Sequence, residues 1–367
     1  IPAWIRANWL VIIYFAVRAM TLIKMDFEYS TIRTIFFEVF FLIGITECTV
    51  GGSDKRNLYI KIFVWMELVL TAVSLLLYYM LPYLGSGING FAESMMFLEK
   101  CGNAMVFSNP NTAGLMAGFS IVLAIVCLGK NIFNNKFIIF YGLYNVAALI
   151  LFGCRSSDIG VIAAIAVLVL MKLIPKLNGR IIAAAVLIMM VLSVIPIYGF
   201  IKSQGNMAYD AFTETELAID YYSSGRYVVW KGCYIAQQDD LMLGNGSLKM
   251  EQADRAELIK DMDPDYYWRQ ARSAELGPHN GYIAMIAAAG VLGLLLFAVI
   301  ILQRIRRSES LKKGTWCILL VFIFVVNMFE SLFIVNRFFT CFYMLLLLTI
   351  DFNDDGSTDA PSLEETE

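Results

Sequence analysis

The sequence predicts an all-α, multi-pass membrane helix bundle of about ten spans with a long, partly helical outer loop. Three observations predict this class: the composition, the recurrence of apolar stretches, and the charge bias of the short loops. Hydrophobic residues make up 59% of the 367 residues and charged residues only 16%, and the mean hydropathy is +0.67. An ordinary soluble domain carries about 25% charged residues, so this composition indicates a protein that lies in a lipid bilayer.

The apolar stretches approach the length that a helix needs to cross the hydrocarbon core, about 20 residues. They are rich in Ala, Leu and Ile and do not alternate with polar residues over about ten positions, as barrel strands would. We therefore expect each of them to be a helix. In chain order they cover residues 3–23, 32–52, 58–82, 112–129, 136–153, 158–174, 180–200, 279–302, 315–335 and 338–350.

Two polar segments divide the chain into four regions. Residues 1–200 hold transmembrane helices 1–7, and residues 279–350 hold helices 8–10. Residues 201–278 are too polar and too long for a simple connector and are expected to form an extracytoplasmic loop domain. Residues 351–367 carry seven acids and no basic residue, which is typical of a disordered cytoplasmic tail.

The outer loop contains two segments with a helical pattern, residues 251–262 and 264–276. The second contains the aromatic run Tyr266, Tyr267 and Trp268, which suits the membrane interface but equally suits packing onto the helical bundle. We predict amphipathic helices that lie over the membrane-embedded helices. The chain begins Ile1-Pro2 without a methionine, so we expect further residues upstream.

The distribution of Lys and Arg sets the orientation, because cytoplasmic loops carry an excess of these residues. If the loop after residue 200 lies outside, five basic residues flank the outer ends of the spans: Lys24, Arg33, Lys100, Arg155 and Arg337. Fourteen flank the inner ends: Arg6, Lys55, Arg56, Lys61, Lys130, Lys136, Lys172, Lys176, Arg180, Arg304, Arg306, Arg307, Lys312 and Lys313.

The single histidine is the most informative polar residue. His279 opens the apolar run 279–302, and the predicted topology places it on the same outer face as Arg155, Arg226 and Arg337. An imidazole exchanges protons near neutral pH, whereas guanidinium groups stay charged. This combination at a membrane surface indicates chemistry on an anionic, lipid-linked substrate.

Four sequence segments together resemble the O-antigen ligase and polymerase (Wzy/WaaL) family of membrane glycosyltransferases. In order they read FSNPNTAGLMAG, GCRSSDIG, SSGRYVVWKGCYIAQQDDLMLGNGS and GPHNGYIAMIAAAGVLGLLLF. The resemblance covers roughly residues 105–350 and depends on the order and spacing of the segments. One departure is Cys154, where the family usually has serine; Asp158 follows closely, which leaves the local partner of Arg155 open.

The resemblance implies transfer of a glycan from an undecaprenyl-diphosphate donor to an acceptor hydroxyl, without a metal or cofactor. The reaction would take place on the outer face of the bacterial cytoplasmic (inner) membrane. The implied partners are the lipid-linked donor, the glycan acceptor, the bilayer and a chain-length regulator, with no nucleic acid. We favour a polymerase for capsule, exopolysaccharide or O-antigen. The alternatives are an O-antigen ligase and, from another class, a transporter or flippase of lipid-linked sugar.

The residue chemistry supplies roles for such a transfer. Arg155 and Arg226 match the diphosphate oxygens, on which negative charge builds as the donor leaves. His279 is the candidate general base that takes the proton of the acceptor hydroxyl, and direct attack of this kind inverts the anomeric carbon. Arg337, Asn280 and Glu330 are expected to contribute to substrate binding, together with the two catalytic arginines.

Each of these residues also has a structural interpretation. His279 could be a helix-end residue whose imidazole is satisfied by water, and Arg226 could pair with Asp220 or Glu216. Arg155 stands at a helix start, where a cation is unfavourable with respect to the helix dipole and needs a partner or ligand. Arg337 could extend its head to the interface. Asp239 and Asp240 are adjacent carboxylates that could bind a metal ion, but this pattern alone is weak, so no metal site is predicted.

Five charged residues fall inside predicted spans. A charge is costly in lipid and normally faces the bundle interior. We therefore expect all five side chains to point into the bundle, with Glu330, near the outer end of its span, the one closest to the site. The five are Arg18, Glu38, Glu47, Glu67 and Glu330.

Overall fold

Every regular element that the computed structural model describes is helical, which confirms the predicted fold class. The structure describes residues 3–23, 29–84, 106–107, 110–204, 213–223, 226–238, 241–244, 278–308, 311–312, 315–333, 343 and 346–347. Within these ranges, it describes only the backbone of residues 3–7, 21–23, 29–42, 45–53, 81–84 and 236.

Four helices follow the predicted spans to within three residues at each end. They are α1 (Ala3–Ile23), α4 (Pro110–Cys127), α5 (Asn135–Phe152) and α6 (Arg155–Leu173). Helix α5 begins after the N-cap Asn134, whose side chain accepts a hydrogen bond from the backbone N–H of Lys136, as N-cap residues commonly do. The length and composition of the apolar stretches were therefore sufficient to predict these elements.

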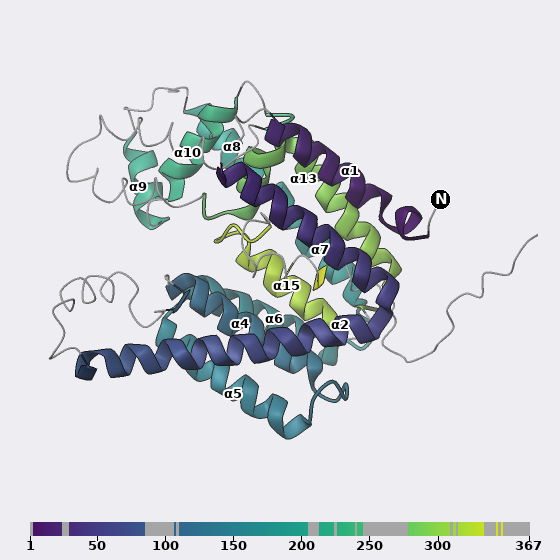
Figure 1. Ribbon diagram of the computed structural model, residues 1–367. Helices are drawn as coiled ribbons and strands as arrows, with labels where there is room; N and C mark the ends of the chain where they lie inside the picture. Colours follow the sequence, from purple (N-terminus) through teal and green to yellow (C-terminus); the bar gives the residue numbers. More distant parts are fainter. Residues whose placement is uncertain are drawn as a thin grey trace, which may run out of the picture.

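The second and third predicted spans, 32–52 and 58–82, form a single helix, α2 (Tyr29–Leu84). The charged residues between them were expected to form a loop, but charged side chains are compatible with a helix and no proline interrupts this stretch. Figure 1 shows that the two halves of α2 run in different directions. The first half lies beside α1, and the second half packs against α4 and α5 through the ring pairs Phe63–Phe119 and Trp65–Phe137.

The span predicted over 180–200 is divided into α7 (Gly179–Leu192) and α8 (Val194–Ser203). The division falls at Ser193, whose hydroxyl donates to the carbonyl of Met190, and Pro196 follows in the first turn of α8. Proline is tolerated there because the first N–H groups of a helix have no intrahelical partner.

The last three spans are only partly recovered. Helix α13 (Gly281–Arg307) matches the span predicted from residue 279, whereas α15 (Trp316–Val326) is shorter than the predicted 315–335. The chain leaves α15 through turns at residues 327–330, which place Glu330 outside the helix. The span predicted over 338–350 lies outside the described residues apart from residues 343, 346 and 347.

Two further helices lie in the segment predicted to form the outer loop, α9 (Glu214–Tyr222) and α10 (Arg226–Gln237). Neither was predicted from the sequence. The two amphipathic helices predicted over 251–262 and 264–276 lie outside the described residues.

The surface of the helices is that of a membrane protein. By length and composition, six of the described helices could cross a membrane, against about ten predicted spans, and α1 and α15 contain shorter apolar helices. Large aliphatic side chains such as Ile150 and Leu173, 75% and 74% exposed, face outward from these helices. Contiguous apolar surface of this kind is suited to lipid.

Helix α15 forms the centre of the bundle, with α4 and α6 on one side and α7 on another (Figure 1). All of its residues except Val325 are buried. Helices α1 and α13 run antiparallel, as shown by the hydrogen bond from Arg304 Nη2 to Asn8 Oδ1 (2.7 Å) near one end and the Tyr14–Phe297 ring contact further along.

The embedded charges whose side chains are described point into the bundle, as predicted. Arg18, Glu67 and Glu330 are all buried. Glu67 accepts hydrogen bonds from Thr71 Oγ1 (2.7 Å) and Asn145 Nδ2 (3.3 Å). The structure does not describe the side chains of Glu38 and Glu47.

The orientation of the bundle in the membrane is a testable prediction. The charge bias predicts that residues near Asn206 and Met250 lie outside the cell membrane. It predicts that Ser308, the C-cap at the basic end of α13, lies inside. Reporter fusions or cysteine-accessibility labelling should give opposite signals for these two groups. Detection of Ser308 on the outer face would contradict the shared outer location of His279 and the arginines.

Candidate functional site

The candidate site begins at the entry to α13. Asn280 is the N-cap of this helix, and its side-chain oxygen accepts hydrogen bonds from the backbone N–H groups of Tyr282 (3.0 Å) and Ile283 (3.1 Å). The Asn280 side chain is fully buried. The sequence predicts Asn280 to bind substrate; the structure gives it the role of fixing the backbone next to His279.

His279 itself has a positive φ of 45°. A non-glycine residue in this left-handed region is uncommon, and such residues cluster at functional sites, where the surrounding structure maintains the strain. Here the neighbours on both sides are fixed: Asn280 by the cap, and Pro278 by a contact to α10 described below. The backbone of His279 is therefore held in this conformation from both sides.

Glu330 is brought to His279 by the end of α15. The backbone N–H of Gly281 donates to the carbonyl of Asn327 (2.7 Å), which joins the start of α13 to the end of α15. A Cβ atom on Gly281 would lie 2.0 Å from Asn327 Oδ1, so only glycine permits this approach. Turn hydrogen bonds after Asn327 then place Glu330 beside the imidazole.

The three polar side chains of His279, Glu330 and Asn111 form a connected set, which we call the His–Glu–Asn cluster. The Nδ1 atom of His279 lies 3.2 Å from Glu330 Oε2, and Asn111 Nδ2 donates to Glu330 Oε1 at 3.2 Å. The side chains of His279 and Glu330 are 17% and 11% exposed. The cluster is therefore sheltered but still reachable, and Nε2 of His279 is the ring nitrogen that this contact does not use.

Arg226 reaches the same end of the bundle from the outer loop. It is the first residue of α10, and its guanidinium carbon lies 6.0 Å from the centre of the Phe329 ring, next in the chain to Glu330. One helical turn further along α10, Trp230 Nε1 donates to the carbonyl of Pro278 (2.8 Å). Helix α10 is thus attached directly to the segment that carries His279.

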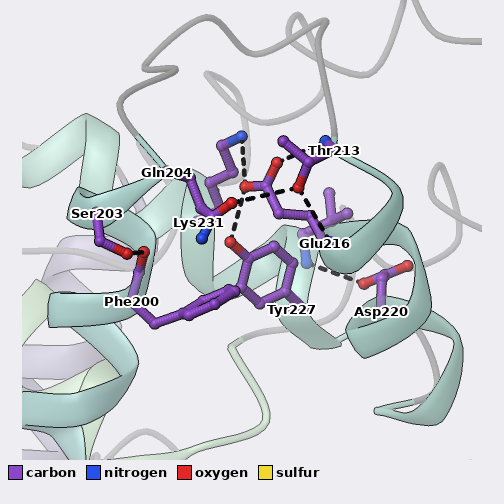
Figure 2. Close-up of polar contacts among 9 residues, drawn as sticks. Phe200, Ser203, Gln204, Thr213, Glu216, Asp220, Tyr227 and Lys231 are labelled. Atoms are coloured by element: carbon purple, nitrogen blue, oxygen red, sulfur yellow. Dashed lines mark hydrogen bonds and ion pairs between the residues drawn. The ribbon is translucent and has the colours of Figure 1, made fainter.

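A buried polar cluster holds α10 against α9 (Figure 2). Lys231 Nζ and the Tyr227 hydroxyl both contact Glu216 Oε1, at 2.9 and 2.8 Å. Glu216 also completes a capping box with Thr213 at the start of α9. This cluster is relevant to Arg226, because Arg226 directly precedes Tyr227 and its position follows from that of α10.

The proposed salt bridge of Arg226 with Asp220 or Glu216 is not formed. Glu216 pairs with Lys231, and Asp220 Oδ1 accepts from the backbone N–H of Val228 (2.9 Å). Within the part of the chain that the structure describes, Arg226 has no carboxylate partner. Neither Glu216 nor Asp220 therefore neutralises the charge of Arg226.

Glu216 is the titrating group of this cluster. Burial acts to raise its pKa, but the hydrogen bonds from the Thr213 backbone, Lys231 and Tyr227 outweigh burial and hold the pKa below its usual range. A lowered folded-state pKa contributes stability that is present above the unfolded pKa, about 4.3, and is lost as the pH falls through the folded value.

We therefore predict that the outer loop loses stability in acid through Glu216. Glu216→Gln should lower the thermal unfolding midpoint at neutral pH, because it leaves Lys231 buried without its counter-charge, at a cost of about 3–5 kcal/mol. It should also flatten the pH dependence below about pH 4.3. Ser203→Ala, on an exposed residue of α8, is the matched control and should change neither. An unaltered acid profile in Glu216→Gln would contradict this assignment.

Arg155 is the first residue of α6. The preceding residue, Cys154, contacts the carbonyl of Asn111 through its sulfur (3.6 Å). This approach of α6 to α4 depends on Gly114, because a Cβ atom there would lie 2.1 Å from Cys154 Cβ. The Arg155 side chain is exposed and has no ion pair with another described residue.

The remaining predicted residues are not described. Arg337, Asp239 and Asp240 lie outside the described residues. Within those residues, no group of three or more His, Cys, Asp or Glu side chains is arranged to hold a metal ion.

Three residues of the site were not among the sequence-predicted site residues. Asn111 lies in the segment that carries the family resemblance, but nothing in its local pattern connects it with Glu330, 219 positions away. Trp230 and Phe329 are ordinary aromatic residues by sequence, and only their contacts with Pro278 and Arg226 relate them to the site.

Fold and site define a multi-pass helical membrane protein with a sheltered histidine–carboxylate pair and, at the same end of the bundle, an arginine that forms no ion pair with a described carboxylate. Residues 140–298 match the family model Wzy_C, described as O-antigen ligase. This segment is therefore similar to the O-antigen ligase family, and it includes Arg155, Arg226 and His279. The comparisons with curated proteins and with solved structures find no match.

Proposed function

We propose that the protein polymerises undecaprenyl-diphosphate-linked oligosaccharide repeat units by inverting glycosyl transfer on the outer face of the cytoplasmic membrane. The observation that carries the proposal is the contact of His279 Nδ1 with Glu330 Oε2 at 3.2 Å. The domain match to the O-antigen ligase family supports the reaction class.

The histidine–carboxylate contact suits a general base. With the Nδ1 proton directed at Glu330, the neutral imidazole carries its lone pair on Nε2, where it can accept a proton from a hydroxyl. Glu330 also stabilises the imidazolium that forms, because the two opposite charges are adjacent. Asn111 holds the other carboxylate oxygen, so the acid is oriented as well.

The arginines suit the leaving group. Charge builds on the diphosphate oxygens as the glycosidic bond to the lipid carrier breaks, and a guanidinium fork matches two such oxygens at once. Arg226 approaches the His–Glu–Asn cluster through Phe329, and Arg155 lies beside Cys154, which contacts Asn111. Fixed positive groups in a sheltered site stabilise developing negative charge more strongly than water does.

In the proposed step, an acceptor sugar hydroxyl attacks the anomeric carbon of the donor from the face opposite the diphosphate. The new C–O bond forms as the bond from this carbon to the phosphate oxygen breaks, and its electron pair leaves with undecaprenyl diphosphate. The hydroxyl proton passes to Nε2 of His279 and afterwards to water. The product has inverted configuration at the anomeric carbon.

A single assay tests the polymerase against the ligase. Purified protein in proteoliposomes is supplied with lipid-linked repeat units, with and without a separate lipid acceptor, and the products are sized on gels. A ladder of increasing length without the second acceptor supports polymerisation. A single transfer that needs the second acceptor identifies a ligase, and movement of the lipid-linked sugar across the bilayer without any product would support the transporter alternative.

Transfer should not require a divalent cation, because the proposal assigns charge neutralisation at the diphosphate to Arg155 and Arg226. Activity in the same assay is expected to survive an excess of chelator. Loss of activity on chelation with rescue by magnesium or manganese alone would contradict this prediction and would direct attention to Asp239 and Asp240.

A further inference from the structure

Helix α13, which His279 precedes, is broken at Gly290. This residue has φ 68° and ψ −178°, a conformation that is essentially restricted to glycine. In an unbroken helix the N–H groups of Val291 and Leu292 would donate to the carbonyls of Ala287 and Ala288, four residues earlier. The break removes both of these hydrogen bonds and leaves main-chain polar groups that must be satisfied inside the bundle.

A segment of the outer loop satisfies the freed donors. The N–H of Val291 donates to the carbonyl of Leu241 (2.9 Å), and that of Leu292 donates to the carbonyl of Met242 (3.2 Å). The approach is so close that Cβ atoms are excluded on both sides. A Cβ on Gly290 would lie 2.1 Å from the carbonyl oxygen of Met242, and one on Gly244 would lie 2.5 Å from the nitrogen of Gly290.

An arginine from α1 satisfies one of the freed acceptors. Arg18 Nη1 donates to the carbonyl of Ala288 at 2.9 Å, and the Arg18 side chain is only 3% exposed. The carbonyl end of the short helix that ends at Ala289 carries partial negative charge, so a cation is favourable there. This contact explains why an arginine is placed within an apolar helix, where it is otherwise costly.

We propose that Arg18, Gly290 and residues 241–244 form an interlock that positions Arg226 relative to His279. The interlock connects the helix that carries Arg226 with the helix that follows His279. Residues 241–244 come after α10, which begins with Arg226, and the part of α13 before the break at Gly290 begins just after His279. Together with the Trp230–Pro278 hydrogen bond, the interlock gives α10 a second attachment to the histidine-bearing helix.

Arg18 is therefore a positioning residue, and this inference rests on the proposed function. Without its guanidinium, the carbonyl of Ala288 loses its donor from α1, and a straight helix that excludes residues 241–244 becomes the better alternative. Straightening restores the hydrogen bonds of Val291 and Leu292 within α13 but releases α10. The distance between the diphosphate site and the base would then vary.

The test combines a distance measurement without substrate with the transfer assay. Genetically encoded spin-label residues replace Tyr222 on α9, 85% exposed, and Val299 on α13, 49% exposed. Arg18→Met should broaden the distance distribution between the labels and lower the transfer rate of folded protein by more than about tenfold. Arg18→Lys, which keeps a donor for the carbonyl of Ala288, should restore a narrow distribution and most of the rate.

The matched control is Arg304→Met. Arg304 is also a buried arginine of the helix pair α1 and α13, but it contacts Asn8 at the opposite end. Its replacement should lower thermal stability without changing the label distances or the rate per folded molecule. An equal loss of rate in Arg304→Met and Arg18→Met would show that Arg18 acts only through stability.

A second pair of variants tests the interlock if Arg18→Met does not fold. Gly290→Ala introduces a methyl group that residues 241–244 cannot accommodate, whereas Gly199→Ala adds one to a helix with open space around it. Broadening in Gly290→Ala but not in Gly199→Ala supports the interlock. Unchanged distances in both Arg18→Met and Gly290→Ala would overturn it, even if the wild-type protein proved to transfer glycans by another mechanism.

Discussion

His279→Gln is expected to abolish glycosyl transfer while the protein stays folded and still binds its donor. An amide can form a hydrogen bond with Glu330, but it cannot take the proton of the acceptor hydroxyl. General-base assistance is worth about 100- to 10,000-fold in rate, so the loss should fall in this range. Donor binding should persist, because the proposal assigns the diphosphate to Arg155 and Arg226 rather than to the imidazole.

Three measurements check this prediction: the transfer rate, donor affinity, and the melting profile of the variant. His279→Ala should be equally inactive. Substantial turnover by folded His279→Gln would rule out the general-base role and leave His279 a positioning residue.

Glu330→Gln gives an intermediate test of the same pair. It keeps an oxygen that can accept the Nδ1 proton of His279 but removes the charge that stabilises the imidazolium. We expect a smaller loss of rate than in His279→Gln. The same rate as in the wild type would show that the 3.2 Å contact is not used in the reaction.

Arg226→Lys is expected to lose most activity although it keeps a positive charge. Lysine replaces the planar fork with a single ammonium group and cannot bind two phosphate oxygens in the same geometry. A hydrogen bond to a charged group contributes about 1.5–3 kcal/mol, which corresponds to a loss of about 10- to 150-fold. The expected change is in donor binding and transfer rate, not in thermal stability.

Arg180→Lys is the matched control for this substitution. Arg180 Nε donates to the carbonyl of Ser308 (2.7 Å) at the basic end of α13, away from His279. It should tolerate lysine with little change in rate. Arg155→Ala tests the second guanidinium and should also lose most activity in a folded protein. Near-normal turnover in Arg226→Lys would indicate a general electrostatic role instead of bidentate recognition.

The positions of the helices could largely be predicted from the sequence, because burial in lipid demands long apolar runs whose length is set by the bilayer. Helices α1, α4, α5 and α6 illustrate this. The joins between helices were predicted less well. The charged residues between the two halves of α2 suggested a loop, and the division of the run over 180–200 at Ser193 was not predicted, although Pro196 is a signal for it. Such details depend on packing, to which hydropathy is insensitive.

For the candidate site, the sequence by itself determined the chemical inventory: one histidine, several basic residues at the predicted outer ends of spans, and a carboxylate at Glu330. Residue type and topology are local properties, so they can be read from the chain. Only the tertiary structure decided the pairings, such as His279 with Glu330 and Asn111 with Glu330. These contacts join segments that are distant in sequence. The close approach of Gly281 to Asn327, which brings Glu330 to His279, exists only once the helices have packed.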